Sequence, residues 1–527
     1  MTSRPGRLEL GVLLAILVLA ALARLPGLDA RGPWDADQGQ DMLVLNGLVQ
    51  NGEIPLLGPK TSVGTFHHGA VYYYLLAPAA AVSGSDPVAV TAEIALFGIA
   101  AVGAVWWLAR LFGGPLAAAA AGLLTAVSPA GIDESTFIWN PNLIPFASAL
   151  AFAAALHAWH SRGTRWWLLS ALGAMITMQC HVLGVVALPP LVVVWALDLR
   201  RRRASGQPVA PLLRAGAGAA AIIVAGYLPL VVHDLTHDFS ETRAILAYVM
   251  GGGGGAASDA GPLGRIATVG LRSVTWPLVG LISERVAASM LAVIAVAGLA
   301  TVALVVGRRA DRRAALWLVG SIGWSVLALA LFAPSLATIT TGLPNDHYHA
   351  FLDPLVLALT GVGLARLAGL GRPLTGRLAG LGLGRLAPVS LVVGALLVVL
   401  AVQAWPPAVS PDGGWALVDR SAGRVIDMVG DEPFALDGIP PFKSANALRF
   451  PLVHRGAEPL DASALQGDSP PTTAVVVCDP LFSDAVGAPC GGPAESAWLA
   501  ATAPGFELAD RFDAGPRRVI SIYAASP

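Results

Sequence analysis

Residues 34–74 hold the densest set of side chains in this sequence that could do chemistry. Asp35, Asp37 and Asp41 lie within seven residues, and the last two would share one face of a helix. A positioned carboxylate can act as the general base that takes a proton from an attacking hydroxyl. Each aspartate could instead cap a helix or lie on a solvated surface, since Asp-x-Asp alone is a common pattern.

The same stretch continues with groups that could bind an anion. It contains Lys60, then the adjacent His67 and His68, and then a run of three tyrosines with Tyr73 at its centre. Lysine and histidine can donate hydrogen bonds to phosphate oxygens. The alternative is an interfacial segment without a ligand, because tyrosine is enriched at membrane surfaces in any case.

Two later segments add further candidates, which are Asn140 and Asn142 in one and His347, Tyr348 and His349 in the other. The asparagine amides could hydrogen-bond a sugar. The two histidines could meet a phosphate, and together with Asp346 they raise the possibility of a metal site. We expect no metal and no other cofactor, although a divalent ion stays possible.

The composition says that these residues are positioned by membrane helices. Mean hydropathy is +0.66 and 13% of the residues are charged, against about 25% in soluble domains. Apolar runs near 20 residues predict about eleven spans, at residues 8–25, 88–112, 116–128, 143–160, 166–181, 182–199, 212–232, 287–306, 314–332, 351–367 and 389–404. No basic domain suggests a nucleic-acid partner.

Charge distribution predicts the orientation. With the N-terminus in the cytoplasm, the inner ends of the spans hold eighteen positively charged residues and the outer segments before the tail hold seven, as the positive-inside rule requires. This holds only if residues 69–82 form a juxtamembrane helix rather than a full span. The first apolar run is interpreted as a retained anchor, not a cleaved signal peptide.

The chain is expected to have two domains. Residues 1–405 form the membrane domain, with a first outer loop at 27–68, and residues 406–527 form a small extracytoplasmic α/β domain. Its predicted elements are a helix near 420–428 and strands at 433–436, 473–478 and 518–523. Cys478 and Cys490 could form a disulfide there or remain free thiols, and Cys180 is expected to be a buried thiol.

The order of these motifs resembles that of GT-C glycosyltransferases, with the ArnT-like and protein O-mannosyltransferase-like enzymes of bacterial family 39 nearest. The resemblance covers roughly residues 8–400. It implies that Asp37 matches the first-loop acid and His68 the basic residue that meets the carrier phosphate. Two departures stand out: Asn142 lies where many relatives have a second aspartate, and His347 to His349 lie where relatives often have Arg-Tyr.

The resemblance implies transfer of a sugar from a polyprenyl phosphate to an acceptor hydroxyl on the outer face, usually with inversion. The expected partners are membrane lipid, that donor, and an acceptor protein, glycolipid or wall glycan. Asp37 is the predicted base, with Asp35 and Asp41 as further catalytic candidates. Two alternatives remain: a transporter or flippase of lipid-linked sugars, and a cell-envelope scaffold whose tail binds partners.

Overall fold

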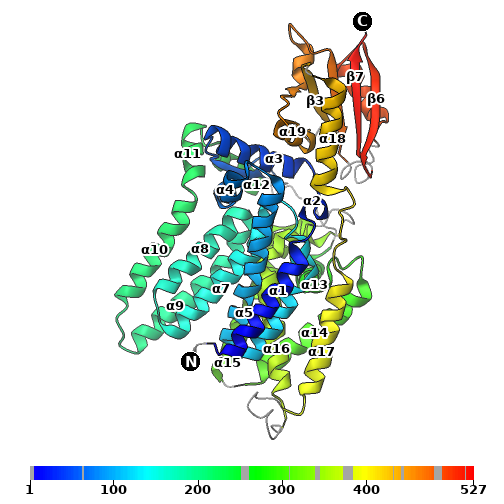
Figure 1. Ribbon diagram of the computed structural model, residues 1–527. Helices are drawn as coiled ribbons and strands as arrows, with labels where there is room; N and C mark the ends of the chain where they lie inside the picture. Colours follow the sequence, from blue (N-terminus) through cyan, green and yellow to red (C-terminus); the bar gives the residue numbers. More distant parts are fainter. Residues whose placement is uncertain are drawn as a thin grey trace.

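The computed structural model describes residues 5–61, 64–250, 260–307, 309–338, 345–371, 384–430, 432–440, 444–479, 490–516 and 518–526. Helices dominate, and they form an elongated bundle with a small α/β domain at one end (Figure 1). The predicted class, a mainly helical protein with a small C-terminal α/β unit, is confirmed.

The long helices of the bundle follow from apolar runs bounded by glycine, proline or charged residues. They are α1 (Arg7–Arg24), α5 (Pro87–Ala126), α7 (Ile144–Ser161), α8 (Arg165–Cys180), α9 (Leu188–Ala204), α10 (Ala210–Gly226), α13 (Pro262–Val279), α14 (Val286–Val305), α15 (Arg309–Phe332), α16 (Asp353–Ala368) and α17 (Ala387–Gln403). Shorter elements carry the site: α2 (Leu28–Arg31), α3 (Ala36–Asn46), β1 (Leu57–Lys60), β2 (His67–Gly69), α4 (Val71–Ser83), α6 (Pro129–Asp133), η2 (Asn140–Leu143), η3 (Val182–Ala187), α11 (Leu228–Thr236), α12 (Ser240–Met250) and η5 (Asp346–Leu352).

Six helical segments of the described residues are long and apolar enough to cross a membrane, or seven if the bent pair α10–α11 is one span. This number is lower than the predicted number of about eleven spans, and the count of eleven stays a prediction. Part of the difference is α5, which merges two predicted spans across a break at Gly114, where φ is 76°. The remaining predicted spans include α8 and α17, which have 16 and 17 residues.

Small residues let the central helices α5, α7, α8 and α16 approach closely. A Cβ added to Gly361 of α16 would lie 2.7 Å from the backbone oxygen of Ala117 in α5, and one added to Gly173 of α8 would lie 2.5 Å from the backbone oxygen of Ala147 in α7. Such close backbone contacts are how membrane helices gain packing energy where lipid is as apolar as the protein. The bundle centre is therefore a rigid support for the loops above it.

The C-terminal domain contains a five-stranded sheet in the order β4-β3-β5-β7-β6. Its strands are β3 (Phe434–Ile439), β4 (Leu460–Asp461), β5 (Thr473–Cys478), β6 (Phe506–Gly515) and β7 (Arg518–Ala525), and its helices include α18 (Gly414–Val429), α19 (Asn446–His454) and α21 (Pro493–Thr502). Strands β4, β3 and β5 are parallel, whereas β7 and β6 extend the sheet antiparallel. The strands expected near 433, 473 and 518 are all present.

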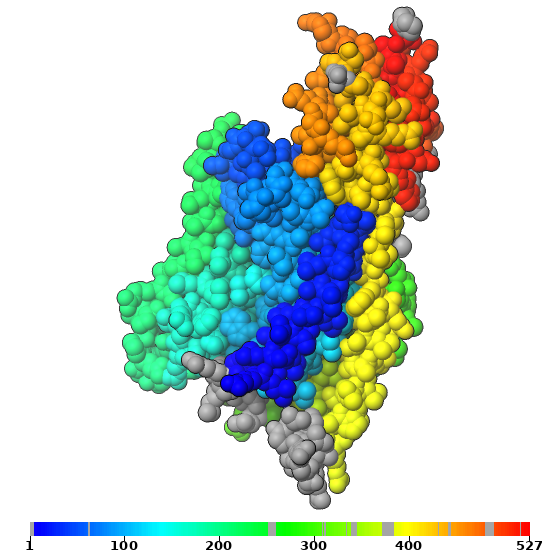
Figure 2. All heavy atoms as spheres, viewed as in Figure 1, coloured from blue at the N-terminus to red at the C-terminus, as the bar shows by residue number. Residues whose placement is uncertain are grey.

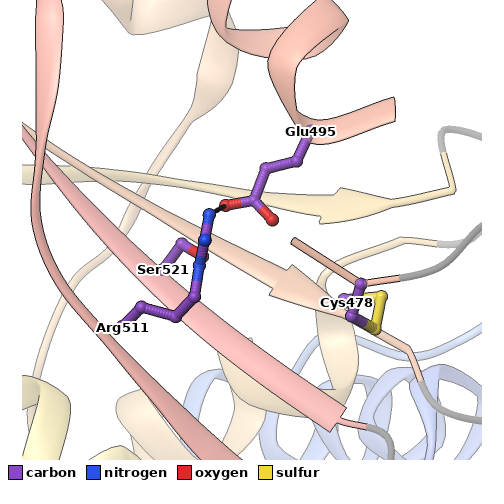
Figure 3. Close-up of a disulfide and its surroundings, with 5 residues drawn as sticks. Cys478, Glu495, Arg511 and Ser521 are labelled. Carbon is purple, nitrogen blue, oxygen red and sulfur yellow. Dashed lines mark hydrogen bonds and ion pairs between the residues drawn. A yellow bond between two sulfur atoms is a disulfide. The ribbon is translucent and has the colours of Figure 1, made fainter. Parts of the chain in front are cut away.

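A disulfide joins Cys478, the last residue of β5, to Cys490, so the disulfide is present of the two alternatives that the sequence left open. Figure 3 shows it beside a buried polar group in which the Glu495 carboxylate accepts from Arg511 at 2.8 Å. Arg511 also donates from Nε to the Ser521 hydroxyl at 2.9 Å. These bonds join α21 to the antiparallel strands β6 and β7, so the helix is held firmly against this edge of the sheet.

The α/β domain stands at the end of the bundle that carries the loop between α1 and α5 (Figure 2). Helix α19 packs against α3, and α18 packs against α2. The acidic segment therefore lies between the two domains, where both can position it. The location of this end outside the cytoplasm stays a prediction.

Candidate functional site

Asp35 begins α3 as its N-cap. Its Oδ1 accepts from the backbone N–H of Asp37 at 2.8 Å, and the Gln38 side chain accepts from the backbone N–H of Asp35 at 2.9 Å. This reciprocal pair is a capping box, which satisfies two backbone donors at the helix start. Asp35 therefore caps α3, which is one of the alternatives considered for it from the sequence. Its catalytic role stays a prediction.

Asp37 and Asp41 follow in α3 but have different surroundings. The Asp37 side chain is exposed, whereas Asp41 is only 2% exposed. The hydroxyls of Tyr72 and Tyr73 donate to the Asp41 carboxyl at 2.9 and 2.8 Å. Burial raises the pKa of Asp41 to about 8, against the lowering effect of these two hydrogen bonds. Asp37 is therefore the acid of α3 that an acceptor can reach, and Tyr73 is engaged inside.

The α/β domain holds the residue that precedes α3. The backbone N–H of Trp34 donates to Asp412 Oδ2 at 2.7 Å, and its indole N–H donates to the Ala447 carbonyl at 2.8 Å. Its ring lies 4.6 Å from that of Trp415, and Arg518 donates to its carbonyl. Because Trp34 is nearly fully buried, the start of α3 is fixed from the C-terminal side of the chain.

The hairpin of β1 and β2 carries the basic residues predicted from the first loop. Lys60 ends β1 and is exposed, and it lies opposite His67 in the ladder. His67 faces α12, where its Nδ1 lies 2.9 Å from Glu241 Oε1 and its backbone N–H donates to Glu241 Oε2 at 2.7 Å. His68, the next residue, points to the other side and is buried.

Three histidines from distant parts of the chain meet beside β2. The ring of His68 lies 4.9 Å from that of His181, which lies 5.6 Å from that of His347. The Nδ1 atoms of His68 and His347 are buried and have no hydrogen-bond partner among the described residues. Burial holds the pKa of His68 well below its usual range, with the nearby His181 as a further cause, so this ring is neutral at neutral pH.

His181 was not singled out in the sequence because it ends an apolar run, with Gln179 as its nearest polar neighbour. The structure places it between two predicted residues, His68 and His347, with Tyr348 5.0 Å away. The signal that could have found it is its position at the C-terminal end of α8, the end nearer the acidic loop (Figure 1).

A buried ion pair, also missed, positions the segment around His349. Arg272 of α13 binds Asp346 through two contacts, Nε to Oδ1 at 3.0 Å and Nη2 to Oδ2 at 2.6 Å. His349 Nε2 lies 2.9 Å from Asp346 Oδ1. Arg272 had been counted only as an outer charge, since its partner lies 74 residues away in sequence.

Asn140 and Asn142 make backbone contacts in the structure. Asn140 donates to the Cys180 carbonyl, and Asn142 donates to the Phe137 carbonyl at 2.8 Å. Their amide groups therefore hold the turn before α7, and a role in sugar binding stays a prediction.

Asn142 also borders a small cavity of about 30 Å³ together with Glu134, Asp353 and the buried Arg24. Glu134 Oε2 and Asn142 Oδ1 are buried there without a partner in the described part of the chain. Burial raises the pKa of Glu134 well above its usual range, and the neighbouring Asp353 adds to the effect. A volume of this size holds about one water molecule, so the cavity suits a water or a shared proton rather than a substrate.

The described residues contain no group of three or more His, Cys, Asp or Glu side chains arranged to hold a metal ion. Asp346, His347 and His349 are therefore organised around Arg272 and the histidine group in this structure. Whether a divalent ion takes part in the reaction is a matter for experiment.

The fold and the site together define a class: a multi-pass membrane protein whose acidic helix α3 lies at one end of the bundle, against a C-terminal α/β domain. Residues 67–228 match the family model described as dolichyl-phosphate-mannose-protein mannosyltransferase. No curated protein sequence matches the chain.

Solved structures extend the comparison to the whole chain. ArnT from Cupriavidus metallidurans in the apo state aligns with a TM-score of 0.63 at 14% identity, over 98% of this chain and 99% of ArnT. An oligosaccharyltransferase from Archaeoglobus fulgidus aligns with a TM-score of 0.51 at 12% identity, over 99% of this chain and 74% of that one. The arabinofuranosyltransferase AftD from Mycobacteria gives 0.53 at 17% identity, over 99% and 42%. The chain therefore has the fold of these solved glycosyltransferases along its whole length.

Proposed function

We propose that the protein transfers a sugar from a polyprenyl phosphate to an acceptor hydroxyl on the outer face of the membrane. The observation that carries the proposal is α3, which presents the exposed Asp37 on the same short helix whose start is clamped by the α/β domain. ArnT from Cupriavidus metallidurans has also been solved with undecaprenyl phosphate, and this chain aligns with that structure at a TM-score of 0.64 and 13% identity.

The proposed mechanism needs three elements: a base, a group to stabilise the departing phosphate, and a rigid frame. Asp37 is the base, because it is the accessible carboxylate of α3. His68 and His347, with His181 between them, are the phosphate-binding candidates, and Lys60 is exposed on the hairpin that carries His68. Preorganised donors aimed at developing charge commonly contribute more to such catalysis than any other single effect.

The neutral state of His68 has a consequence for phosphate binding. An anionic phosphate beside the ring favours its protonated form, since an opposite charge nearby stabilises the ionised state. Binding of the carrier phosphate would then take up a proton, and its affinity would rise as pH falls. The titratable groups that share this region are His67, His181 and His347, with Asp346, His349 and Arg272 acting on His347.

The direct test is transfer from a radiolabelled polyprenyl-phosphate sugar by the purified protein to acceptor fractions of the cell envelope. Asp37→Asn should lower kcat by about 10²–10⁴-fold, the typical contribution of a positioned general base, with little change in melting temperature. Asp29→Asn is the matched control, because Asp29 is an exposed aspartate of the same loop in α2. Undiminished transfer by Asp37→Asn would remove this mechanism.

A transporter or flippase of lipid-linked sugars is the alternative from another class. It would move the labelled lipid across a vesicle membrane without breaking the sugar–phosphate bond. The same assay separates the two, since only a transferase releases free polyprenyl phosphate in step with labelled acceptor.

A further inference from the structure

A groove opens between α8, α9 and α10, three helices that lie together along one side of the bundle (Figure 1). Its volume is about 380 Å³, within the range of small-molecule sites. One stripe of each helix lines it, at residues 167–174, 188–195 and 213–223. Spacings of three and four residues put each stripe on a single helix face.

The walls of this groove suit hydrocarbon. Alanine, glycine, leucine, valine and isoleucine line it, with Trp167 and Trp195 at the sides. The lining hydroxyl, Ser170, already donates to the Ala151 carbonyl at 2.9 Å. Helix α9 belongs to one of the apolar segments that can cross a membrane, and α10 to the bent pair. The medium around the groove is therefore lipid, and its natural occupant is an acyl chain.

Positive charge surrounds the end of the groove where α8 begins, α9 ends and α10 begins. Residues 161–226 contain seven arginines and one acidic residue. Five of the arginines are exposed: Arg162, Arg165, Arg200, Arg203 and Arg214. The acidic residue, Asp198, is buried and already pairs with Arg202 at 3.2 Å. Nothing in this segment offsets the exposed arginines, so they would favour a phosphate.

The tryptophans leave hydrogen-bonding capacity in the wall. The indole N–H groups of Trp167 and Trp195 are buried and find no acceptor among the residues described here. Trp195 lies against α10, since a Cβ on Gly216 would be 2.9 Å from its ring. Tryptophan is favoured at the depth where acyl chains meet headgroups, with one apolar face and one polar donor.

We propose that this groove binds an anionic phospholipid, with one acyl chain between α9 and α10 and the phosphate at the exposed arginines. Basic pockets between membrane helices bind anionic headgroups in this way. Arginines alone would only orient the protein in the membrane. The apolar groove beside them is what makes the place a site.

The test measures lipid retention rather than sugar transfer, so its result is independent of the proposed function. The full-length protein is purified in mild detergent, supplied with defined phosphatidylglycerol or phosphatidylcholine, and examined by native mass spectrometry. We expect one phosphatidylglycerol to remain bound where phosphatidylcholine is lost. Ala217→Phe, which fills the groove from an exposed position on α10, should abolish retention of both lipids.

Gly320→Phe is the matched control, because Gly320 is exposed on α15 with no heavy atom within 4 Å of an added Cβ; it should retain the lipid. Replacing Arg200, Arg203 and Arg214 by Gln should weaken phosphatidylglycerol about fivefold per residue and remove its advantage over phosphatidylcholine. Equal retention of both lipids by the unchanged protein would overturn the proposal. So would displacement of the bound phospholipid, one for one, by polyprenyl phosphate, since the groove would then belong to the donor.

Discussion

At the scale of single residues, α3 separates two aspartates that look equivalent in the sequence. Asp37 and Asp41 are one turn apart, yet one is exposed and the other is enclosed by two tyrosine hydroxyls. Sequence spacing predicted that they share a face. It could not predict the difference in burial, because that is decided by α4, about 30 residues further along the chain.

The buried carboxyl should make stability depend on pH. The pKa of Asp41 is about 8 in the folded protein and 3.8 in the ordinary state, so between these values the folded state binds more protons than the unfolded state. Stability should therefore fall as pH rises from about 4 to 8, by on the order of a few kcal/mol since each pKa unit corresponds to about 1.4 kcal/mol. Asp41→Asn should flatten this decline, as measured by melting temperatures in detergent from pH 5 to 8.5.

Asp29→Asn provides the control for this titration, because its side chain is exposed in α2 and it is not among the groups that act on Asp41. It should leave the slope of melting temperature against pH unchanged. A slope that persists in Asp41→Asn would mean that another group titrates, and the enclosed carboxyl would not be its origin.

At the scale of elements, the site depends on contacts between segments far apart in the chain. Sequence reasoning found the residues of the first loop and the His347–His349 segment by type and clustering. It missed His181 and Arg272, because each lies in a largely apolar stretch and acquires its partners only when α8, α13 and η5 come together. No local sequence pattern shows which of these elements will come into contact.

Arg272 should be the clearest case of this dependence. It is 1% exposed and holds Asp346 through two hydrogen bonds, so Arg272→Met leaves the buried carboxylate with only His349 beside it, which should cost up to about 3–5 kcal/mol. The double variant Arg272→Met, Asp346→Leu removes both charges and should recover most of that loss. Unfolding in denaturant, compared among the three proteins, measures it.

Arg265→Met is the matched control on the same helix, where the arginine is half-buried and its Nε donates to the Ala260 carbonyl at 3.0 Å. We expect a loss below about 1 kcal/mol, as for most changes outside the core. If Arg272→Met costs no more than this control, the pair does not fix α13 to η5.

The contact between α3 and α19 gives a second element-scale prediction. A Cβ at Gly39 would lie 1.8 Å from the Asn446 carbonyl oxygen, so Gly39→Leu must push the α/β domain away from α3. Sugar transfer should fall while the bundle stays folded, because Asp37 lies on the same helix. Limited proteolysis of the segment between α17 and α18 should accelerate, and circular dichroism should keep its helical signal.

Gly47→Ala serves as the comparison, since its added Cβ meets only the flexible end of Glu53 at 2.7 Å. It should preserve transfer and protease resistance. Full activity in Gly39→Leu would show that the α/β domain does not position the acidic helix.

At the scale of the whole molecule, the sequence predicted the fold class, with its helical bundle and its α/β unit, better than it predicted the number of membrane spans. Apolar composition and arginine distribution are properties of long segments, so they survive errors in individual boundaries. The span count does not, because α5 continues past the break at Gly114 and the pair α10–α11 bends by 48°. Local hydropathy does not say whether two apolar runs are one helix or two.

The disulfide leads to a prediction about sidedness. Disulfides persist in oxidising compartments and are rare in the cytosol, so Cys478–Cys490 favours an α/β domain outside the cytoplasm. The exposed arginines at the α9–α10 end favour the cytoplasmic side there. A membrane-impermeant maleimide should therefore label Asp468→Cys in intact cells, and should label Ser205→Cys only after lysis; both positions are exposed.

Cys180, the free cysteine of the described residues, is fully buried, so the unsubstituted protein gives the background for both labels. The paired cysteines should become reactive only after reduction, and their loss should lower the domain's stability by about 3 kcal/mol, as expected for a short closed loop. Labelling of Ser205→Cys but not Asp468→Cys in intact cells would mean that the protein lies in the membrane in the opposite orientation to the one predicted. The acidic helix, which packs against the α/β domain, would then face the cytoplasm, and transfer to an acceptor on the outer face would be impossible from this site.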